Sequence, residues 1–416
     1  MSTPSQPAPL PSFEEARRRV EEQARSLRPG AAEPVPLPAA RGRVLAEPLV
    51  ADRDFPPFPR ATRDGYAVRS ADLAALPASL RVVGEVRAGV APPAGLSLAP
   101  GQAVEIMTGA PVPAGADAVV MVEHTARQGD SVVVQKAVAS GENVVPTGIE
   151  ARRGSAVVAA GTRLDAVAIA VAAAVGCTQV QVYARPRVAI LPTGDELVEI
   201  AAQPASYQIR NSNSYSLAAQ VEAAGGEPRQ LPIAPDQAAP LRRLIEQGLS
   251  CDLLLLSGGV SMGKYDLVEQ VLAGLKAEFF FTGAQIQPGR PVVFGRASAK
   301  PDATPACFFG LPGNPVSTLV CFELFARPLI DALAGAPPLP LAFTQARLSS
   351  EIRTKTGLTR FLPATLSGRN GPAEVAPVRW QGSGDMVSLT RANCYIVVPP
   401  GRECLPAGEM VSVLLR

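Results

Sequence analysis

The stretch 251–266, CDLLLLSGGVSMGKYD, constrains the fold of this chain more than any other. Its four consecutive leucines form a short apolar run that is typical of a strand buried on both faces of a parallel sheet. Ser257, Gly258 and Gly259 follow, where the backbone can turn tightly and expose its N–H groups. Asp266 then stands where a helix would begin. Proteins of the α/β class often bind phosphate where a strand, a glycine turn and a helix follow one another. The alternative is a plain strand-to-helix connection that binds no ligand.

Two further segments repeat this pattern. An apolar run at 188–191 precedes PTGDEL, and another at 306–309 precedes GLPGNP and a helical stretch from 316 onward. Helical patterns separate these runs, so the alternation predicts a mostly parallel sheet covered by helices. The three glycine turns should converge on the edge where open α/β sheets bind ligands.

The flanking regions lack this alternation and predict a multidomain α/β plus β protein. Ser12 and Glu15 form a capping box that opens a helix, and an Ala/Val run at 165–175 predicts a second helix ending at Gly176. We expect these two helices to pack together. Short alternating runs predict β structure on both sides of the α/β region. The expected domains are a helical/linker domain from 12–50 with 150–185, a small mostly β domain at 51–149, the α/β domain at 186–336 and a C-terminal β domain at 337–416.

Composition narrows the function classes. The length of 416 residues suits two to four domains, and a net charge of +2 gives no reason to expect nucleic acid or an anionic membrane as partner. No segment has the apolar length of a membrane span, and the first residues do not resemble a secretory signal. The six cysteines are scattered without CxxC pairs, and several lie in apolar runs, which is typical of small core residues. We therefore expect a cytoplasmic protein.

The single histidine, His124, disfavours a His-rich zinc site and a Ser-His-Asp triad. It follows an apolar run and is most simply a strand-end residue. Catalysis would then rest on carboxylates, hydroxyls, Lys or Arg, backbone N–H groups and a hard metal ion such as Mg²⁺.

A proline-rich segment precedes Asp64 and Gly65. Pro56, Pro57 and Pro59 stiffen the chain ahead of this turn, which can hold an exposed carboxylate in place, or can be an ordinary hairpin turn. Downstream, the tight turn MTGAP presents the hydroxyl of Thr108.

Together these motifs resemble one family. PTGDEL at 192–197, SGGVSMGKYD at 257–266 and GLPGNPVS at 310–317 look like the MogA-like molybdopterin-binding domain of the MoeA/gephyrin family. The flanking motifs, DGYAV at 64–68, MTGAPVPAGADAVVMVE at 107–123 and QGSGDMVSL at 381–389, resemble the other MoeA domains. The smaller MogA-type adenylyltransferases share only the central domain.

The resemblance implies molybdenum insertase (molybdopterin molybdenumtransferase) activity in molybdenum cofactor biosynthesis. Such proteins take adenylylated molybdopterin and molybdate as substrates and release molybdenum cofactor and AMP, with Mg²⁺ or another divalent ion. The resemblance also implies a homodimer whose cleft uses both chains. A MogA-type adenylyltransferase and molybdoenzyme maturation factors are the implied protein partners.

The resemblance implies a set of site residues at the matching motif positions of this chain. The implied catalytic residues are Asp64, Glu196, Ser261 and Asp266, and the implied metal ligands are Asp64, Asp195, Glu196 and Asp266. Carboxylates suit Mg²⁺, although each could instead be a turn or helix-cap acid. The implied pterin and molybdate ligands are Thr108, Thr193, Gly194, Ser257, Gly258, Gly259, Arg290, Pro312, Gly313, Asn314, Ser317 and Ser383. Among them, backbone N–H groups at the two glycine turns can hold the pterin phosphate.

Several positions depart from the family pattern. Gln287 and Arg290 stand where family members often have the two lysines of Lys-Pro-Gly-Lys. Val145 lies in a stretch that is usually Arg-rich, and Pro363 replaces an expected arginine. Arg290 is therefore the expected principal cation for an oxyanion, with a solvated strand-end arginine as the alternative. These changes indicate a weakened, shifted or retuned anion pocket.

Two other functions compete with the insertase. A non-catalytic molybdopterin-binding or scaffold protein would keep pterin binding without turnover. An adenylyltransferase would consume Mg·ATP and molybdopterin instead, but the full set of MoeA-like flanking motifs disfavours it.

Overall fold

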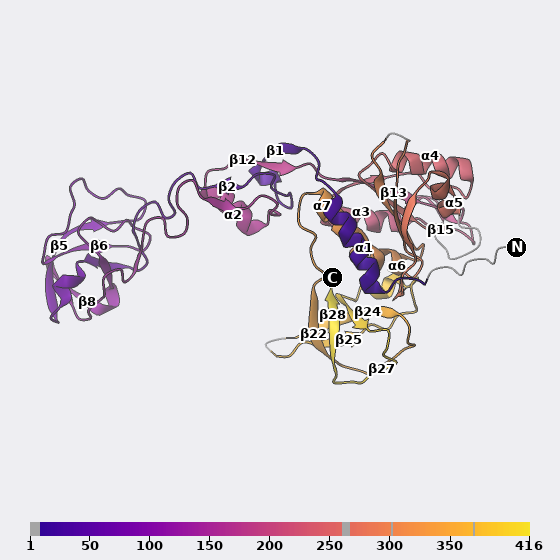
Figure 1. Cartoon of the computed structure of the whole chain (residues 1–416). Coiled ribbons are helices and arrows are strands. Elements are labelled where there is room, and N and C mark those ends of the chain that lie inside the picture. Colours follow the sequence, from indigo (N-terminus) through magenta and orange to yellow (C-terminus); the bar gives the residue numbers. More distant parts are fainter. Residues whose placement is uncertain (1–8, 260–266, 301–302, 369–370) are drawn as a thin grey trace. The chain divides into compact units, whose positions relative to one another are not determined.

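The computed structural model describes residues 9–259, 267–300, 303–368 and 371–416. Its contacts divide the chain into two compact units, which are treated separately below (Figure 1). The first unit comprises Met1–Val35, Gly42–Ala46 and Gln181–Arg416, and the second comprises Pro36–Arg41 and Glu47–Val180. The chain passes between the units within β1 (Ala32–Pro36), on either side of the segment Gly42–Ala46, and within β12 (Gln179–Tyr183).

A six-stranded sheet forms the centre of the first unit, in the order β16-β13-β17-β21-β20-β18. The first four strands in this order run parallel, and β20 alone runs in the opposite direction to the other five strands of this sheet. The predicted mostly parallel sheet is therefore confirmed. The strands are β13 (Arg187–Pro192), β16 (Glu227–Gln230), β17 (Leu253–Ser257), β18 (Glu278–Thr282), β20 (Val293–Ala297) and β21 (Ala306–Leu311).

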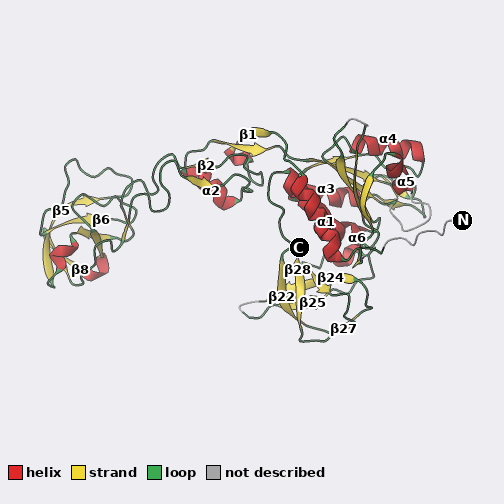
Figure 2. Cartoon of the chain, in the orientation of Figure 1, coloured by secondary structure: helices red, strands yellow, loops and turns green. Residues whose placement is uncertain are grey.

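Helices cover both faces of this sheet (Figure 2). Alternate leucines of β17 face opposite sides of the sheet. Leu253 and Leu255 belong to one apolar cluster, and Leu254 and Leu256 belong to another. The first cluster takes in α1 (Phe13–Ser26), α3 (Asn213–Ala223), α6 (Pro315–Cys321) and α7 (Arg327–Leu333). The second takes in α4 (Ala238–Gly248) and α5 (Leu267–Gly274).

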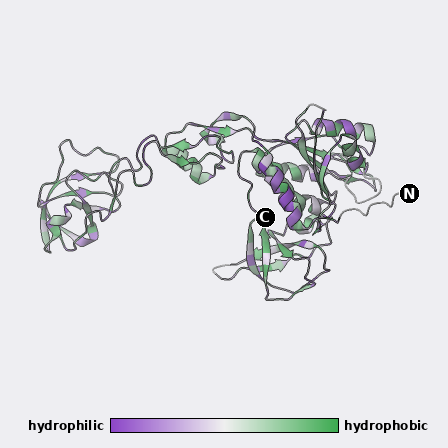
Figure 3. Ribbon diagram, in the orientation of Figure 1, coloured by the Kyte–Doolittle hydropathy of each residue, from purple (hydrophilic) through white to green (hydrophobic). Residues whose placement is uncertain are grey.

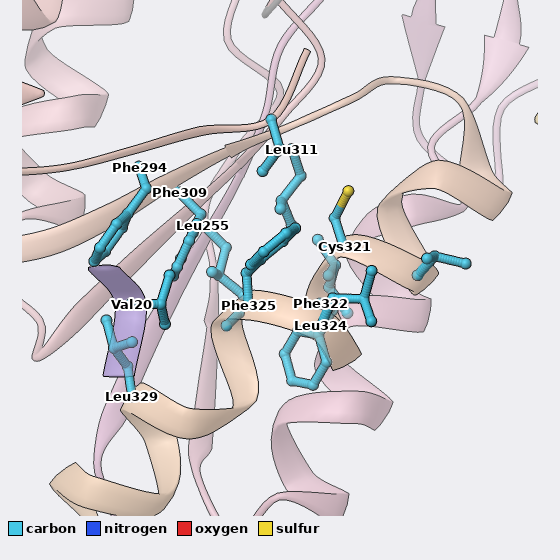
Figure 4. Packing of buried hydrophobic residues seen from close by; sticks show 14 of the residues in the cluster. Val20, Leu255, Phe294, Phe309, Leu311, Cys321, Phe322, Leu324, Phe325 and Leu329 are labelled. Carbon is cyan, nitrogen blue, oxygen red and sulfur yellow. The ribbon is translucent and has the colours of Figure 1, made fainter. Parts of the chain in front are cut away.

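The first cluster holds the N-terminal helix against the α/β domain. Figure 4 shows Val20 of α1 close to the buried residues of the sheet and of α7, among them Leu255, Phe309 and Leu329. The Phe13 ring lies 6.2 Å from that of Phe325 and 5.1 Å from that of Phe361. The predicted pairing of this helix with the 165–175 helix is wrong, because its apolar stripe is buried in the α/β core instead. The capping box is confirmed at Ser12, which accepts the N–H of Glu15 at 3.2 Å.

The long helix predicted from residue 316 onward is interrupted. A π-helical segment, η4 (Phe322–Ala326), separates α6 from α7. Pro328 follows within the first turn of α7 and cannot donate the backbone hydrogen bond that a regular helix would need. The interruption lies within the apolar core, where Phe322 and Phe325 are fully buried.

A second sheet forms the predicted C-terminal β domain, in the order β19-β24-β25-β22-β28-β26. An additional pairing of β24 with β26 closes five of these strands into a barrel. The strands are β19 (Ile286–Gln287), β22 (Phe343–Leu348), β24 (Thr359–Ser367), β25 (Glu374–Pro377), β26 (Cys394–Val398) and β28 (Met410–Leu415). β23 (Ile352–Arg353), β27 (Cys404–Leu405) and α8 (Met386–Leu389) complete it, and β14 (Leu197–Val198) pairs with β15 (Ile209–Arg210) beside α3.

The second unit contains the predicted small β domain. Its main sheet has the order β7-β4-β6-β5-β9-β8 and buries its own apolar core. These strands are β4 (Gly65–Val68), β5 (Ala78–Val86), β6 (Gln102–Ile106), β7 (Ala118–Met121), β8 (Thr125–Gln128) and β9 (Ser131–Val134). The remaining elements are η1 (Leu37–Ala39), β2 (Leu49–Val50), β3 (Arg60–Ala61), η2 (Ser70–Leu73), η3 (Val122–His124), β10 (Val144–Val145), β11 (Ala156–Val158) and α2 (Ala166–Ala174). The predicted helix cap at Asp165 is present, since its carboxylate accepts the N–H of Ala168 at 2.8 Å.

The histidine and the cysteines lie in ordinary structural positions. His124 ends η3 and is partly exposed, as an ordinary strand-end residue would be. All six cysteines are free, and Cys307, Cys321 and Cys394 are buried.

Figure 3 shows hydrophilic and hydrophobic residues mixed along α1, as on a surface helix. Within the described residues, no helix is both long enough and apolar enough to span a membrane.

Candidate functional site

A cavity of about 470 Å³ lies at the carboxyl ends of β13, β17 and β21. Each of the three predicted turns contributes to its lining, so their predicted convergence is confirmed. The start of β20 reaches the same edge of the sheet because β20 runs antiparallel to β21. The turn residues that line the cavity are Thr193, Glu196, Ser257, Gly258, Arg290, Pro291, Pro312, Gly313 and Asn314.

The two glycines after β17 are required by space as well as by backbone conformation. Gly258 has a φ of +94° and Gly259 a φ of +63°. A Cβ on Gly258 would lie 2.5 Å from the carbonyl oxygen of Thr193, and a Cβ on Gly259 would lie 2.7 Å from Thr193 Oγ1. The turns after β13 and β17 therefore pack closely enough to exclude any side chain between them.

One predicted role of Gly258 is not supported by its hydrogen bonding. Its N–H already donates to the carbonyl of Leu311 at 3.1 Å, and the N–H of Thr193 donates to Ser257 O at 3.0 Å. These bonds link the three turns, but they use the N–H group of Gly258, which was expected to face a phosphate. The N–H groups of Gly313 and Asn314 make no hydrogen bond within the described part of the chain, so they remain the better donors to an anion.

Asn213 lines the cavity although the sequence did not single it out. Its Nδ2 donates to Ser257 Oγ and to Gly313 O, both at 2.8 Å. Because a carbonyl can only accept, the bond to Gly313 fixes the orientation of the amide. The signal that could have revealed this residue is the Asn/Ser run RNSNS, in which α3 begins, because a helix also begins close after other site turns.

The C-terminal domain contacts the third turn through Ser383. Asn314 Nδ2 donates to Ser383 Oγ at 2.9 Å, and the N–H of Val316 donates to the carbonyl of Ser383 at 3.0 Å. Ser383 thus positions the turn from which Gly313 and Asn314 present their N–H groups. Ser317 is only 3% exposed within α6 and does not line the cavity.

The predicted acids divide into different environments. Glu196 is exposed and lines the cavity, and Gly194 lies beside its carboxylate. Asp195 accepts the N–H of Asp236 at 3.0 Å and behaves as a turn acid. No group of three metal-ligating side chains occurs among the described residues, and the predicted Ser261 and Asp266 lie outside them.

Arg290 is the cation that the structure places in the cavity. Its side chain is exposed and makes no hydrogen bond or ion pair within the residues described here. Gln287, at the other end of the same turn, accepts a hydrogen bond from Arg360 Nε at 2.8 Å. Gly289 lies between them with a φ of +107°, and its position against Ile286 and Cys321 leaves no room for a side chain.

In the second unit the structure brings Asp64 and Thr108 together. The carboxylate of Asp64 accepts the backbone N–H of Thr108 at 2.6 Å and its hydroxyl at 2.7 Å. These bonds, the backbone one first, lower the pKa of Asp64 below its ordinary value of 3.8. The predicted fixed and exposed carboxylate is therefore present, and the residue that holds it is Thr108.

Val145, the departure from the family pattern in this unit, lies in β10 opposite Arg60, which is not a predicted site residue. Arg60 forms an exposed ion pair with Glu150 at 3.5 Å. In the first unit, a larger cavity of about 1050 Å³ opens at the opposite edge of the α/β sheet, near Ser250 and Ala297. It contains none of the glycine turns, so the smaller cavity is the better candidate site.

Comparison with known proteins gives three consecutive matches along the chain. The model of the "MoeA N-terminal region (domain I and II)" matches residues 11–176, that of the "Probable molybdopterin binding domain" matches 189–332 and that of the "MoeA C-terminal region (domain IV)" matches 345–415. A molybdopterin molybdenumtransferase of Nostoc sp. is 37% identical over 387 residues, covering 91% of this chain and 88% of that protein. The chain belongs to the MoeA family.

Other MoeA-family proteins agree with this assignment. A molybdopterin molybdenumtransferase of Synechococcus elongatus is 36% identical and covers 92% of this chain and 94% of its own length. The crystal structure of a molybdopterin biosynthesis MoeA protein from Pyrococcus horikoshii OT3 matches with a TM-score of 0.80 at 32% identity, over 98% of this chain and 100% of that one. The predicted family and fold class are confirmed, as is the predicted enzyme class, a transferase.

Proposed function

We propose that this MoeA-family transferase acts in molybdenum cofactor biosynthesis and inserts molybdate into adenylylated molybdopterin, releasing molybdenum cofactor and AMP. The observation that carries the proposal is the convergence of three glycine turns and Arg290 on one cavity of about 470 Å³. A cavity of this size suits a small organic ligand. Membership of a family with a probable molybdopterin-binding domain supports a molybdopterin derivative as that ligand.

The polar part of the cavity suits the phosphate groups of this substrate. The N–H groups of Gly313 and Asn314 are free within the described residues and can donate to phosphate oxygens. Arg290 lines the same cavity and can make a charged, bidentate contact with molybdate, the second anionic substrate. Cleavage of the phosphoanhydride consumes one water and yields two phosphate ends, so the protein mainly has to position the groups and neutralise charge.

The apolar part of the cavity suits a flat heteroaromatic ring. Leu197 and Ile209, from the paired strands β14 and β15, line the cavity together with Pro291. A pterin can bury its faces on such side chains while its polar edge meets Asn213. Leu197 ends the PTGDEL motif but was not predicted as a ligand-binding residue, and Ile209 lies outside every motif recognised in the sequence.

Mg²⁺ remains part of the proposal. Glu196 offers one free carboxylate at the cavity, and Asp266 is the second acid expected there, although it lies outside the described residues. Mg²⁺ commonly binds through one or two carboxylates together with substrate phosphates and waters, so this donor set fits the ion. When bound, the ion would neutralise charge on the phosphate groups.

The resemblance supports three further parts of the proposal. We infer a homodimer in which Asp64 and Asp266 serve one cleft from different chains. A MogA-type adenylyltransferase is the natural supplier of the adenylylated substrate, and molybdoenzyme maturation factors would receive the product. A cytoplasmic location fits these partners.

Two incubations separate the proposed function from its alternatives. With adenylylated molybdopterin, molybdate and Mg²⁺, we expect AMP and molybdenum cofactor as products. With Mg·ATP and molybdopterin, we expect no consumption of ATP. Consumption of ATP would identify an adenylyltransferase, whereas pterin binding without any turnover would identify a scaffold protein.

A further inference from the structure

The larger cavity of the α/β domain carries an excess of positive charge. It measures about 1050 Å³, and α4, the end of α5, β18 and the end of β20 contribute to its lining. Four cations and two acids line it. Two arginines are already neutralised, because Arg242 pairs with Glu246 at 2.9 Å and Arg296 pairs with Glu278 at 2.6 Å. The two other cations are lysines.

The first of these, Lys276, has a backbone conformation that favours glycine. It lies two residues after α5 with a φ of +57°. Its N–H donates to Ala273 O at 2.9 Å, and the N–H of Ala277 donates to Leu272 O at 3.0 Å, as in the Schellman motif that ends many helices. Glycine is the usual residue at this position, because a Cβ is strained at positive φ. The lysine therefore lowers the stability of the fold, which indicates a role for its side chain.

The second lysine, Lys300, adds another ammonium group from the segment after β20. The side chains of Lys276 and Lys300 are exposed and form no hydrogen bond or ion pair within the described part of the chain. Leu275 and Ala299, each next to one of these lysines in the sequence, are half-buried and also line the cavity. The lining thus combines two available charges with apolar side chains that are only partly covered.

This lining favours separated carboxylates over a phosphate group. Both α4 and α5 end at the cavity, and the C-terminal end of a helix carries partial negative charge, which disfavours a dense anion. The three glycine turns of the sheet, with their backbone N–H donors, lie at the opposite edge. A lysine ammonium is a point charge that can pair with a single carboxylate. The volume is at the upper limit for small-molecule sites, so the cavity has room for a segment of chain.

We propose that this cavity is a docking site for an acidic segment of a partner protein. Carboxylates of the segment would pair with Lys276 and Lys300, and an apolar side chain between them would cover Leu275 and Ala299. The cavity is separated from the candidate site by the length of β17, whose five residues span about 16 Å. A partner held here would leave the candidate site open to its substrates. The proposal does not depend on the insertase activity, because it rests on the lining alone.

Lys276→Gly separates docking from a purely structural role of this lysine, namely to complement the dipole of α5. The substitution removes the ammonium and relieves the strained φ, so the midpoint of denaturant unfolding should rise while docking weakens. A double variant, Lys276→Gly with Lys300→Ala, removes both available charges. Lys355→Ala is the matched control, since it removes an exposed lysine of the C-terminal β domain that does not line this cavity.

The probe is a short fluorescein-labelled peptide of glutamates around a central leucine, and the same peptide with glutamines is its control. Fluorescence anisotropy with the full-length protein at constant ionic strength gives the Kd. We expect the Kd to rise about twofold to fivefold in Lys276→Gly, the value of one exposed ion pair, and about fourfold to twenty-five-fold in the double variant. Lys355→Ala should bind as the wild type does. AMP release should be the same in all four proteins, because the small substrates do not use this cavity.

Four results would overturn the proposal. They are absence of binding to the wild type at millimolar concentration, equal binding of the glutamine peptide, an unchanged Kd in the double variant, and loss of binding in Arg290→Ala, which would place the peptide in the candidate site. Displacement of the peptide by micromolar inorganic pyrophosphate would assign the lysines to a phosphate ligand and overturn it as well. Loss of AMP release in the wild type would contradict only the insertase proposal, because peptide binding is measured without pterin.

Discussion

At the scale of single residues, the site depends on a few polar groups whose partners are fixed. Asp64 is an exposed carboxylate held by two hydrogen bonds from one residue, and Arg290 is a guanidinium with no protein partner in the described structure. The first arrangement stabilises a charge within the protein. The second leaves a charge available to a ligand. Each arrangement leads to a different measurement.

Thr108→Val should raise the pKa of Asp64 while leaving it below the ordinary value. The substitution removes the hydroxyl donor but keeps the backbone N–H, which is the larger cause of the lowered pKa. Because the folded pKa is depressed, the stabilisation from ionised Asp64 is present above its ordinary value of 3.8 and is lost as the pH falls through the folded pKa. NMR titration of the carboxyl group tests this. Thr125→Val is the control, since its hydroxyl donates to Val122 O instead. An unchanged pKa in Thr108→Val would show that the hydroxyl bond does not form in solution.

Arg290→Ala should raise the molybdate concentration for half-maximal AMP release by about tenfold to a hundredfold, the value of a charged hydrogen bond. Arg290→Lys should recover only part of the loss, because a point charge replaces a planar fork. The assay is AMP release against molybdate concentration for the three proteins. Arg296→Ala, which removes an arginine paired with Glu278 at 2.6 Å and lining the other cavity, provides the control. Equal half-saturation in Arg290→Ala and wild type would place the anion elsewhere.

At the scale of elements, the close packing of the turns decides the shape of the cavity. The turn after β17 approaches that after β13 so closely that Gly258 cannot carry a side chain. Hydrogen bonds from Asn213 and from Gly258 link the same turn to the one after β21. The three turns therefore form one connected edge.

Gly258→Ala should destabilise this edge by about 1–3 kcal/mol, because the new Cβ meets a backbone oxygen at a positive φ. Denaturant unfolding measures the loss, and pterin binding should weaken with it. Gly401→Ala is a matched control, since nothing lies within 4 Å of a Cβ at that position. Equal stability of the two variants would show that the turns separate easily in solution.

The element scale also shows what could be predicted from the sequence. β13, β17 and β21 were recognisable because four to six apolar residues end at a glycine turn, and the parallel arrangement followed from the helices between them. The packing of α1 could not be predicted, because its partners Phe325 and Phe361 lie more than three hundred residues away in the sequence. The same holds for Arg360, whose contact with Gln287 depends on a pairing between two distant strands. Local patterns specify elements, whereas their partners are set by the tertiary fold.

At the scale of the whole molecule, the chain forms two compact units and the first is assembled from three separate segments. The candidate cavity lies entirely in the first unit, while the predicted catalytic Asp64 lies in the second. The homodimer that we propose would bring both to one reaction. The predicted four-domain division of the chain stays a prediction.

Mixed dimers test this assignment. Asp64→Ala and Asp266→Ala should each be inactive, and re-association of an equal mixture should restore about a quarter of the wild-type activity. This value follows if half of the dimers are mixed and each has one intact site of two. Native mass spectrometry would verify that mixed dimers form. Mixed dimers without activity, or a fully active monomer in sedimentation, would contradict a shared cleft.

The central claim is that the protein inserts molybdate into adenylylated molybdopterin at this cavity. Measuring AMP release with and without molybdate tests it most directly. The account predicts that AMP and molybdenum cofactor appear together and that both depend on molybdate and on Arg290. AMP release that proceeds equally well without molybdate, or bound pterin that yields no AMP at all, would contradict it.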